Sequence, residues 1–345
     1  MPGRDIIVIG ASAGGVEALT TLVRGLPADL SAAVFIVLHI PPQSPSLLPS
    51  ILSRSGPLSA AHPRDGDPIR AGQIYVAPPD HHLLIEQGRV RVVRGPKENR
   101  HRPAVDPLFR SAACIYGQRV IGVVLTGSLD DGTAGLQAIK TRGGIAVAQA
   151  PEDALYPSMP RSAVENVAVD YCLPMAQMAS LLAELANNPV ADEESYPVPR
   201  EMELESRIVG MDMAALQSEE RPGLPSAFSC PECNGVLYEL HDSDLVRFRC
   251  RVGHAFSVES VFAEQAEALE TALWVALNTL EESASLGRRM AQQARERGHM
   301  MLVRRFESKA RESEQRAATI RQVLVRDDPI TGLAEIEETS GDAVA

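Results

Sequence analysis

Short runs of β-branched residues alternate with stretches of helical pattern from residue 5 to about residue 186. The clearest strand candidates are DIIVIG, AAVFIVLHI, QIYVAP, VIGVVLTG and GIAVAQ, and VAVDYCL is a weaker one. Stretches such as VEALTTLVRGL and AGLQAIKTRG lie between them, and this alternation is typical of a parallel sheet with helices on both faces. HLLIEQGRVRVV instead predicts a β-hairpin with its turn at Gln87-Gly88. We therefore expect a doubly wound, mostly parallel α/β domain over residues 1–186.

The composition excludes several other classes of protein. With 345 residues, 45% hydrophobic and 23% charged, the chain is expected to be globular and to form about two domains. A formal net charge of −12 argues against nonspecific binding to nucleic acid or to anionic membranes. No apolar run approaches the roughly 18 residues of a membrane span, and the amino-terminal run is too short for a signal peptide. We expect a cytoplasmic protein without membrane insertion.

The pattern changes after the α/β region. Residues 187–228 are acidic and interrupted by prolines, which predicts an exposed linker, although RIVGMDMAAL could be ordered. Residues 229–256, the cysteine module, contain most of the cysteines. In residues 257–325 apolar side chains recur mostly every three or four positions, with a break at Gly298, which predicts a helical hairpin or short coiled coil. Residues 326–345 are predicted to form a flexible tail.

The first strand candidate runs into GASAGG, with Ser12 between small residues. One interpretation is a tight turn before a helix, which needs only small side chains. The other is a nucleophile elbow, in which the turn exposes a serine hydroxyl. The dinucleotide and P-loop motifs fit less well, because Ser12 replaces a required glycine and no lysine follows. Taken locally, the structural interpretation is the stronger one.

Polar residues follow two other strand candidates as well. His39 ends AVFIVLH, and Asp130 and Asp131 follow VIGVVLTG. Ligands collect at the carboxyl ends of parallel strands, and serine, histidine and a carboxylate are the side chains of acyl transfer. Each has a structural alternative: His39 could close a strand by bonding a carbonyl, and Asp-Gly often forms a turn. Spacing alone leaves the choice between the two aspartates open.

The cysteine module contains CPEC and CRVGH, separated by a stretch of hairpin length. This spacing predicts a zinc ribbon in which Cys230, Cys233, Cys250 and His254 hold one structural zinc ion. The alternative is a set of buried thiols beside a surface histidine. Arginines flank Cys250, but the acidic surroundings argue against nucleic-acid binding.

The α/β region resembles the chemotaxis methylesterase (CheB-type) family. The motifs that carry the resemblance agree in order and spacing over nearly all of residues 5–186: GASAGG, VLHIP, YVAPPDHHL, RPAVDPLF, LTGSLDDGTAGL and SMPRSA. The resemblance implies a doubly wound hydrolase that removes methyl groups from glutamate methyl esters of chemoreceptors. Some members of the family also deamidate glutamines.

The resemblance also implies roles for individual residues. Ser12 matches the nucleophile, His39 the base and Asp131 the orienting carboxylate. Backbone groups of Ala13 and Ser128 match the oxyanion donors, although the family usually has threonine and methionine there. The resemblance adds no catalytic cofactor.

Two further features qualify the resemblance. Family members commonly carry an amino-terminal receiver domain, and the sequence begins at the catalytic domain, so we expect either another form of regulation or constitutive activity. The cysteine module and helical region are similar to extensions of some relatives, which implies an accessory region that contacts other signalling proteins. In the basic loop around His101, Arg100 and Arg102 are candidate contacts for an acidic receptor helix, and a solvated loop is the alternative.

The sequence therefore predicts a serine methylesterase acting on methylated chemoreceptor-like proteins. Two alternatives stay open: a non-catalytic signalling scaffold, and a carboxylesterase for small molecules.

Overall fold

The computed structural model describes residues 3–190, 196–218, 222–242 and 245–325. The predicted tail, 326–345, lies outside these residues. The chain divides into two compact units, Met1–Val261 and Phe262–Ala345. Among the described residues, no helix combines the length and the apolar composition that crossing a membrane requires.

The first unit is built on a parallel sheet of seven strands in the order β3-β4-β2-β1-β7-β8-β9. The strands are β1 (Ile6–Ala11), β2 (Ala33–Leu38), β3 (Ser59–Ala61), β4 (Gln73–Val76), β7 (Val120–Val124), β8 (Ile145–Gln149) and β9 (Tyr171–Leu173). The predicted α/β fold is confirmed. Only the short edge strand β3 has no counterpart in the prediction, because SAA has neither the length nor the β-branched residues of a strand signal.

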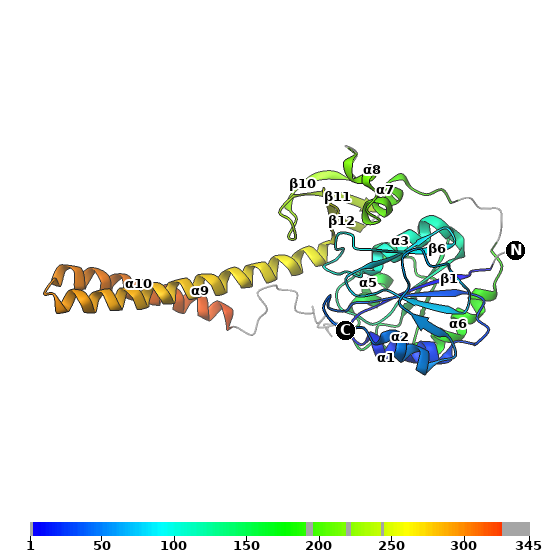
Figure 1. Cartoon of the computed structure of the whole chain (residues 1–345), viewed down its shortest axis with the longest axis horizontal. Coiled ribbons are helices and arrows are strands. Elements are labelled where there is room, and N and C mark those ends of the chain that lie inside the picture. Colours follow the sequence, from blue (N-terminus) through cyan, green and yellow to red (C-terminus); the bar gives the residue numbers. More distant parts are fainter. Residues whose placement is uncertain (1–2, 191–195, 219–221, 243–244, 326–345) are drawn as a thin grey trace, which may run out of the picture. The chain divides into compact units, whose positions relative to one another are not determined.

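Helices cover both faces of this sheet. Figure 1 shows α1 (Gly15–Gly25), α2 (Leu48–Ser55) and α6 (Met175–Asn187) on one side. The other face is covered by α3 (Val105–Tyr116), α4 (Thr133–Thr141) and α5 (Ser158–Asn166). Along β1, Ile7 and Ile9 pack with the first group of helices, while Ile6 and Val8 pack with the second. Every residue of β1 is therefore buried, which explains its continuous apolar sequence.

The predicted hairpin is also confirmed. It consists of β5 (His82–Glu86) and β6 (Arg89–Val93), which pair antiparallel. Gly88 in the turn has φ 72°, a left-handed conformation that glycine adopts without steric cost.

The cysteine module belongs to a second, antiparallel sheet of the same unit. Its strands are β10 (Leu224–Ser229), β11 (Val236–Asp242), β12 (Leu245–Cys250) and β13 (Ala255–Ser257). The apolar core of this sheet is small and consists of Cys230, Leu237, Phe248, Cys250, Phe256 and Val261. So small a core implies that the sheet needs further support, from a metal or from neighbouring elements.

Part of the predicted linker is structured. Residues 200–217 form α7 (Arg200–Val209) and α8 (Met213–Gln217). Leu204 and Ile208, one helical turn apart, form an apolar cluster with Ala215, and Glu205 on the same helix is buried. The sequence predicted an exposed linker in which RIVGMDMAAL could be ordered, but the acidic side chain of Glu205 is buried and accepts hydrogen bonds from buried arginines.

The second unit contains most of α9 (Val258–Glu296) and all of α10 (Met300–Leu324), which run side by side in Figure 1. Gly298, with φ 75°, lies in the turn between them. Arg288–Glu314, Arg295–Glu307 and Arg321–Glu281 join the helices as an antiparallel pair. Small buried residues line the seam, among them Ala284, Ala291, Ala310 and Ala317. The predicted helical hairpin is confirmed.

Candidate active site

Ser12, His39 and Asp131 follow β1, β2 and β7, which are neighbours in the sheet. Their side chains form a continuous chain of contacts. Nδ1 of His39 lies 3.1 Å from Oγ of Ser12, and Nε2 of His39 lies 2.7 Å from Oδ2 of Asp131. The structure thus brings together the three residues that the sequence singled out.

Asp131 is buried at the amino-terminal end of α3. Its carboxylate accepts the backbone N–H of Val105 at 2.7 Å and of Asp106 at 3.2 Å, and it accepts the Asn99 amide at 2.9 Å. Burial alone would raise its pKa, but the hydrogen bond and charge of His39 and the N–H donors lower the pKa to about 2. Asp131 is therefore ionised at neutral pH.

The ionised carboxylate of Asp131 fixes the tautomer of His39. A carboxylate only accepts hydrogen bonds, so Nε2 of His39 carries the hydrogen. Nδ1 then presents a lone pair to the hydroxyl of Ser12. This is the arrangement that a general base needs before it removes a proton from an alcohol.

The neighbouring Asp130 has a different environment. Its carboxyl group accepts a hydrogen bond from Oγ of Ser257 at 2.7 Å. Burial, followed by the charge of Glu259, raises the pKa of Asp130 well above its usual range. Asp131 is thus the aspartate that contacts His39, as the family resemblance implied.

His101 is a feature that the sequence analysis missed. Its ring stacks on that of His39 with 3.7 Å between centroids and 15° between the planes. Burial and the proximity of His39 lower the pKa of His101 to about 3, so the ring is neutral at pH 7. The preceding residues Asn99 and Arg100 both have positive φ, so the stacking depends on a loop path that no local motif indicates.

An open cleft of about 490 Å³ exposes this site. Its lining includes Ser12, Ala13, His39, His101, Arg100 and Arg102. The guanidinium of Arg102 donates to Asp80 at 2.6 and 2.9 Å and to the Gly95 carbonyl at 2.7 Å. Arg102 therefore holds the loop in place, and much of its hydrogen-bonding capacity is used within the protein rather than offered to a substrate.

The candidate oxyanion donors are Ala13, which follows Ser12 in the chain, and Ser128, which follows Gly127. Both Thr126 and Gly127 lie close to Ser12. The N–H of Ser12 donates to the Thr126 carbonyl at 3.0 Å. A Cβ at Gly127 would lie 2.8 Å from Cβ of Ser12 and 2.0 Å from Sδ of Met159, so only glycine fits there. Ser128 follows this contact directly and Ala13 lines the cleft, but their role as donors stays a prediction.

Cys230, Cys233, Cys250 and His254, the metal cluster, can hold one metal ion, because their ligand atoms all lie within 4.8 Å of one another. Sγ of Cys233 and Cys250 are 3.7 Å apart, and Nδ1 of His254 lies 3.7 and 3.6 Å from Sγ of Cys230 and Cys250. Tetrahedral zinc with its usual bond lengths places two sulfurs about 3.8 Å apart, and a sulfur and a nitrogen about 3.6 Å apart. The donor set and its spacing therefore fit such an ion.

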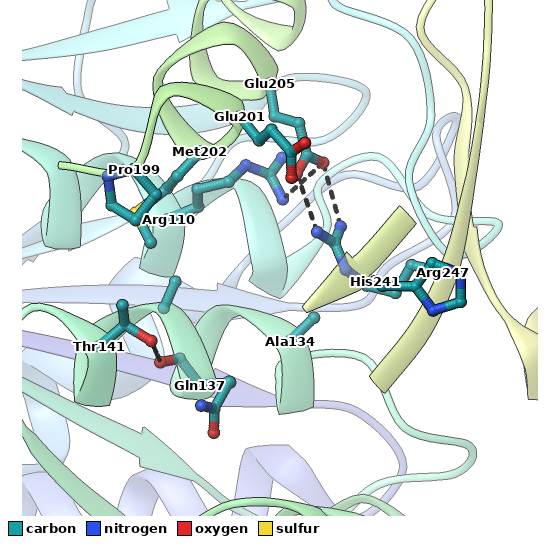
Figure 2. Close-up of a pocket in the computed structure, with 11 residues that line it drawn as sticks. Arg110, Ala134, Gln137, Thr141, Pro199, Glu201, Met202, Glu205, His241 and Arg247 are labelled. Carbon is teal, nitrogen blue, oxygen red and sulfur yellow. Dashed lines mark hydrogen bonds and ion pairs between the residues drawn. The ribbon is translucent and has the colours of Figure 1, made fainter. Parts of the chain in front are cut away.

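A buried ionic network joins α3 and α7 to strand β12 of the antiparallel sheet β10–β13. Figure 2 shows Glu205 of α7 between Arg110 of α3 and Arg247 of β12. Glu205 accepts from Arg247 at 2.8 and 3.0 Å and from Arg249 at 2.7 and 3.1 Å, and Glu98 accepts from Arg110 and Arg249. Burial alone would raise the pKa of Glu205, but the arginine charges lower it well below its usual range.

This network was also missed by the sequence analysis, which considered Arg247 and Arg249 only as residues flanking a metal ligand. Both are buried in ion pairs, so they offer no surface to nucleic acid. Their spacing of two along β12 places them on one face of the strand, but their partners come from distant segments.

Comparison with known proteins gives a consistent result. The profile of the CheB methylesterase family matches residues 7–182. A putative protein-glutamate methylesterase/protein-glutamine glutaminase of Leptospira interrogans is 40% identical over 185 residues, which are 53% of this chain and 96% of that protein. A protein-glutamate methylesterase/protein-glutamine glutaminase of Anaeromyxobacter dehalogenans is 41% identical over 181 residues, 52% of this chain and 53% of that one.

Among solved structures, the Thermotoga maritima CheB methylesterase catalytic domain is 35% identical, with a TM-score of 0.51. The similarity covers 54% of this chain and all of that domain. Sequence and structure thus agree over the parallel-sheet region, and the chain belongs to the CheB methylesterase family.

Proposed function

We propose that the parallel-sheet region hydrolyses methyl esters of glutamate side chains on chemoreceptor-like proteins, with Ser12 as the nucleophile. The observation that carries the proposal is the unbroken chain of contacts from Oγ of Ser12 through His39 to Asp131. Relatives named protein-glutamate methylesterase/protein-glutamine glutaminase support the substrate class.

In the first half of the reaction, Oγ of Ser12 attacks the ester carbonyl while Nδ1 of His39 takes its proton. Asp131 stabilises the resulting imidazolium by accepting the hydrogen bond from its Nε2–H. When the tetrahedral intermediate collapses, His39 gives the proton to the departing methoxide, which leaves as methanol. The glutamyl group stays on Ser12 as an ester.

In the second half, His39 removes a proton from water, and the resulting hydroxide attacks the acyl group on Ser12. Collapse returns the proton to Ser12 and releases a glutamate carboxylate. A glutamine side chain follows the same steps with ammonia as the leaving group, so the site also supports deamidation. Backbone N–H groups of Ala13 and Ser128 are the proposed donors to the oxyanion.

Lys97, Arg100 and Arg102 give the cleft a basic lining, which suits an acidic receptor helix. Lys97 also forms an ion pair with Glu232, and Arg102 with Asp80. Arg100 and Arg102, which both line the cleft beside Ser12, are the residues we propose for contact with the substrate. Such a substrate implies a cytoplasmic location. We assign the helical hairpin to contacts with other signalling proteins.

Asp131→Asn should lower kcat by about 10³- to 10⁴-fold, because an amide no longer fixes the tautomer of His39 or stabilises its cationic form. Methanol release from methylated receptor measures the effect. Asp130→Asn is the matched control, since its amide oxygen still accepts the bond from Ser257, and it should stay within a few-fold of wild type. Equal losses in the two variants would contradict the proposed role of Asp131.

We propose zinc as the ion of the metal cluster, where its role is structural because the protein supplies all four ligands. Elemental analysis should find about one zinc per chain in the purified protein and little in Cys230→Ser. Cys172→Ser, which changes an exposed cysteine outside the cluster, should keep the metal. Wild-type protein without zinc, or with another metal at that stoichiometry, would contradict the assignment.

A further inference from the structure

We propose that the cysteine module is a working part of the esterase site: it holds Asn99, Asn99 positions Asp131, and occupancy of the metal cluster therefore sets the activity of Ser12. The inference rests on the proposed roles of Ser12, His39 and Asp131. It makes Asn99 a positioning residue. It also gives a function in the reaction to the cysteine module, which lies beyond the family match ending at residue 182.

Asn99 connects the two parts through both ends of its side chain. Its Nδ2 donates to Oδ1 of Asp131 at 2.9 Å and to Oδ2 of Asp106 at 2.8 Å. Its Oδ1 accepts the backbone N–H of Ser257 at 2.9 Å and Oγ–H of Ser260 at 3.3 Å. The side chain is thus fixed between the carboxylate that orients His39 and the segment that follows the metal cluster.

The backbone of Asn99 is held by the cysteine module as well. Its N–H donates to the Ala255 carbonyl at 2.8 Å, and Ala255 directly follows the ligand His254. Asn99 has φ 47°, a left-handed conformation that costs a non-glycine residue free energy, less for asparagine than for most, and that persists where the surroundings constrain it. The contacts with Ala255 and Ser257 supply that constraint.

The rest of loop 97–102 is anchored near the metal cluster too. Nζ of Lys97 pairs at 2.7 Å with Glu232, which lies between the ligands Cys230 and Cys233. The Lys97 carbonyl accepts the N–H of Ala255 at 3.3 Å. The loop therefore contacts residues adjacent to both pairs of ligands, Glu232 and Ala255, before it reaches His101, whose ring stacks on His39.

Metal loss should disturb this anchor because the apolar core of the module is small and includes metal ligands. Two of the six residues in its apolar core, Cys230 and Cys250, are themselves metal ligands. In such modules metal binding supplies most of the folding free energy. Without the ion, Ala255 and Ser257 lose their fixed positions, and Asn99 loses three of its hydrogen-bond partners. Asp131 then loses the hydrogen bond that the Asn99 amide donates to it.

The experiment is a cycle of four full-length proteins: wild type and Asn99→Ala, each with zinc and after removal of zinc by a chelator. Zinc content, methanol release, and hydrogen exchange over residues 97–106 are measured for all four. We expect zinc removal to lower the kcat of wild type about 10- to 100-fold, the value of one hydrogen bond to a charged group, with KM little changed. Asn99→Ala should keep its zinc and show a similar loss in kcat.

The decisive result is that the two changes are not independent. If the module acts through Asn99, removing zinc from Asn99→Ala should lower its kcat only a few-fold further. If the two changes are independent, the two losses in kcat should multiply. Cys172→Ser, outside the metal cluster, should retain zinc and wild-type kcat, while His254→Ala should lose zinc and show the about 10- to 100-fold lower kcat of zinc-free wild type. Multiplied losses, or zinc-free protein with the kcat and hydrogen exchange of the zinc-bound form, would overturn the inference.

Two outcomes need separate readouts. If zinc removal unfolds the parallel-sheet region, zinc-bound Asn99→Ala alone tests the inference. A kcat equal to that of zinc-bound wild type then overturns it. If wild type releases no methanol, the proposed function fails, but hydrogen exchange at residues 97–106 still decides whether zinc orders the loop. Unchanged exchange on zinc removal counts against the coupling in either case.

Discussion

Ser12→Ala should reduce methanol release from methylated receptor by at least about 10³-fold while leaving the fold intact. The reaction needs an atom that forms a bond to the ester carbonyl, and the hydroxyl of Ser12 is the group that His39 contacts at 3.1 Å. Alanine keeps the backbone N–H that bonds the Thr126 carbonyl and adds no bulk beside Gly127. Circular dichroism and thermal unfolding should match those of wild type.

Ser50→Ala, an exposed serine in α2, serves as the control and should be fully active. The same assay separates the alternative functions. A signalling scaffold predicts no methanol from either protein, and a small-molecule carboxylesterase predicts turnover of simple esters but not of receptor. Full methanol release by Ser12→Ala would contradict the proposed mechanism.

Glu205→Ala should lower the free energy of unfolding by about 3–5 kcal/mol, the cost of removing one partner from a buried ionic network. The side chain of Glu205 is 1% exposed and accepts bonds from Arg247 and Arg249. Without it, the buried guanidinium groups of Arg247 and Arg249 lose the carboxylate to which both donate, while Glu98 still accepts from Arg249. Calorimetric unfolding of the full chain measures the effect.

Glu201→Ala changes an exposed glutamate on the same helix and should shift the free energy of unfolding by no more than about 0.5 kcal/mol. The pH dependence gives a second check. Because the pKa of Glu205 is lowered in the folded state, its stabilisation is present above its unfolded pKa and is lost as the pH falls through the folded pKa. Acidification should therefore destabilise wild type more than Glu205→Ala, and equal effects of the two substitutions would contradict a structural role of the network.

The sequence predicts both the parallel-sheet fold and the proximity of Ser12, His39 and Asp131, and for the same reason. Buried parallel strands are continuous apolar runs, and their carboxyl ends meet at one edge of the sheet. A polar residue within a few positions after each run is therefore expected at that edge without knowledge of the strand order. The metal cluster was accessible because its ligands come in short-range pairs.

The missed features depend on contacts between distant segments. Glu205 lies in a stretch whose acidic composition predicts exposure, and only the position of Arg247 and Arg249 makes its burial favourable. His101 and Asn99 lie in a loop whose path follows from contacts with Ala255 and Ser257, more than 150 residues later. Neither periodicity nor motif spacing carries such information.

The central claim is that Ser12 is the nucleophile activated by His39, and covalent labelling tests it most directly. The full-length protein is treated with a serine-directed fluorophosphonate, the modified peptide is located by mass spectrometry, and methanol release is followed in parallel. The account predicts one modified residue, Ser12, with activity lost in proportion to labelling, and little labelling in His39→Ala. Labelling at another serine that abolishes activity, or undiminished methanol release from protein fully labelled at Ser12, would contradict it.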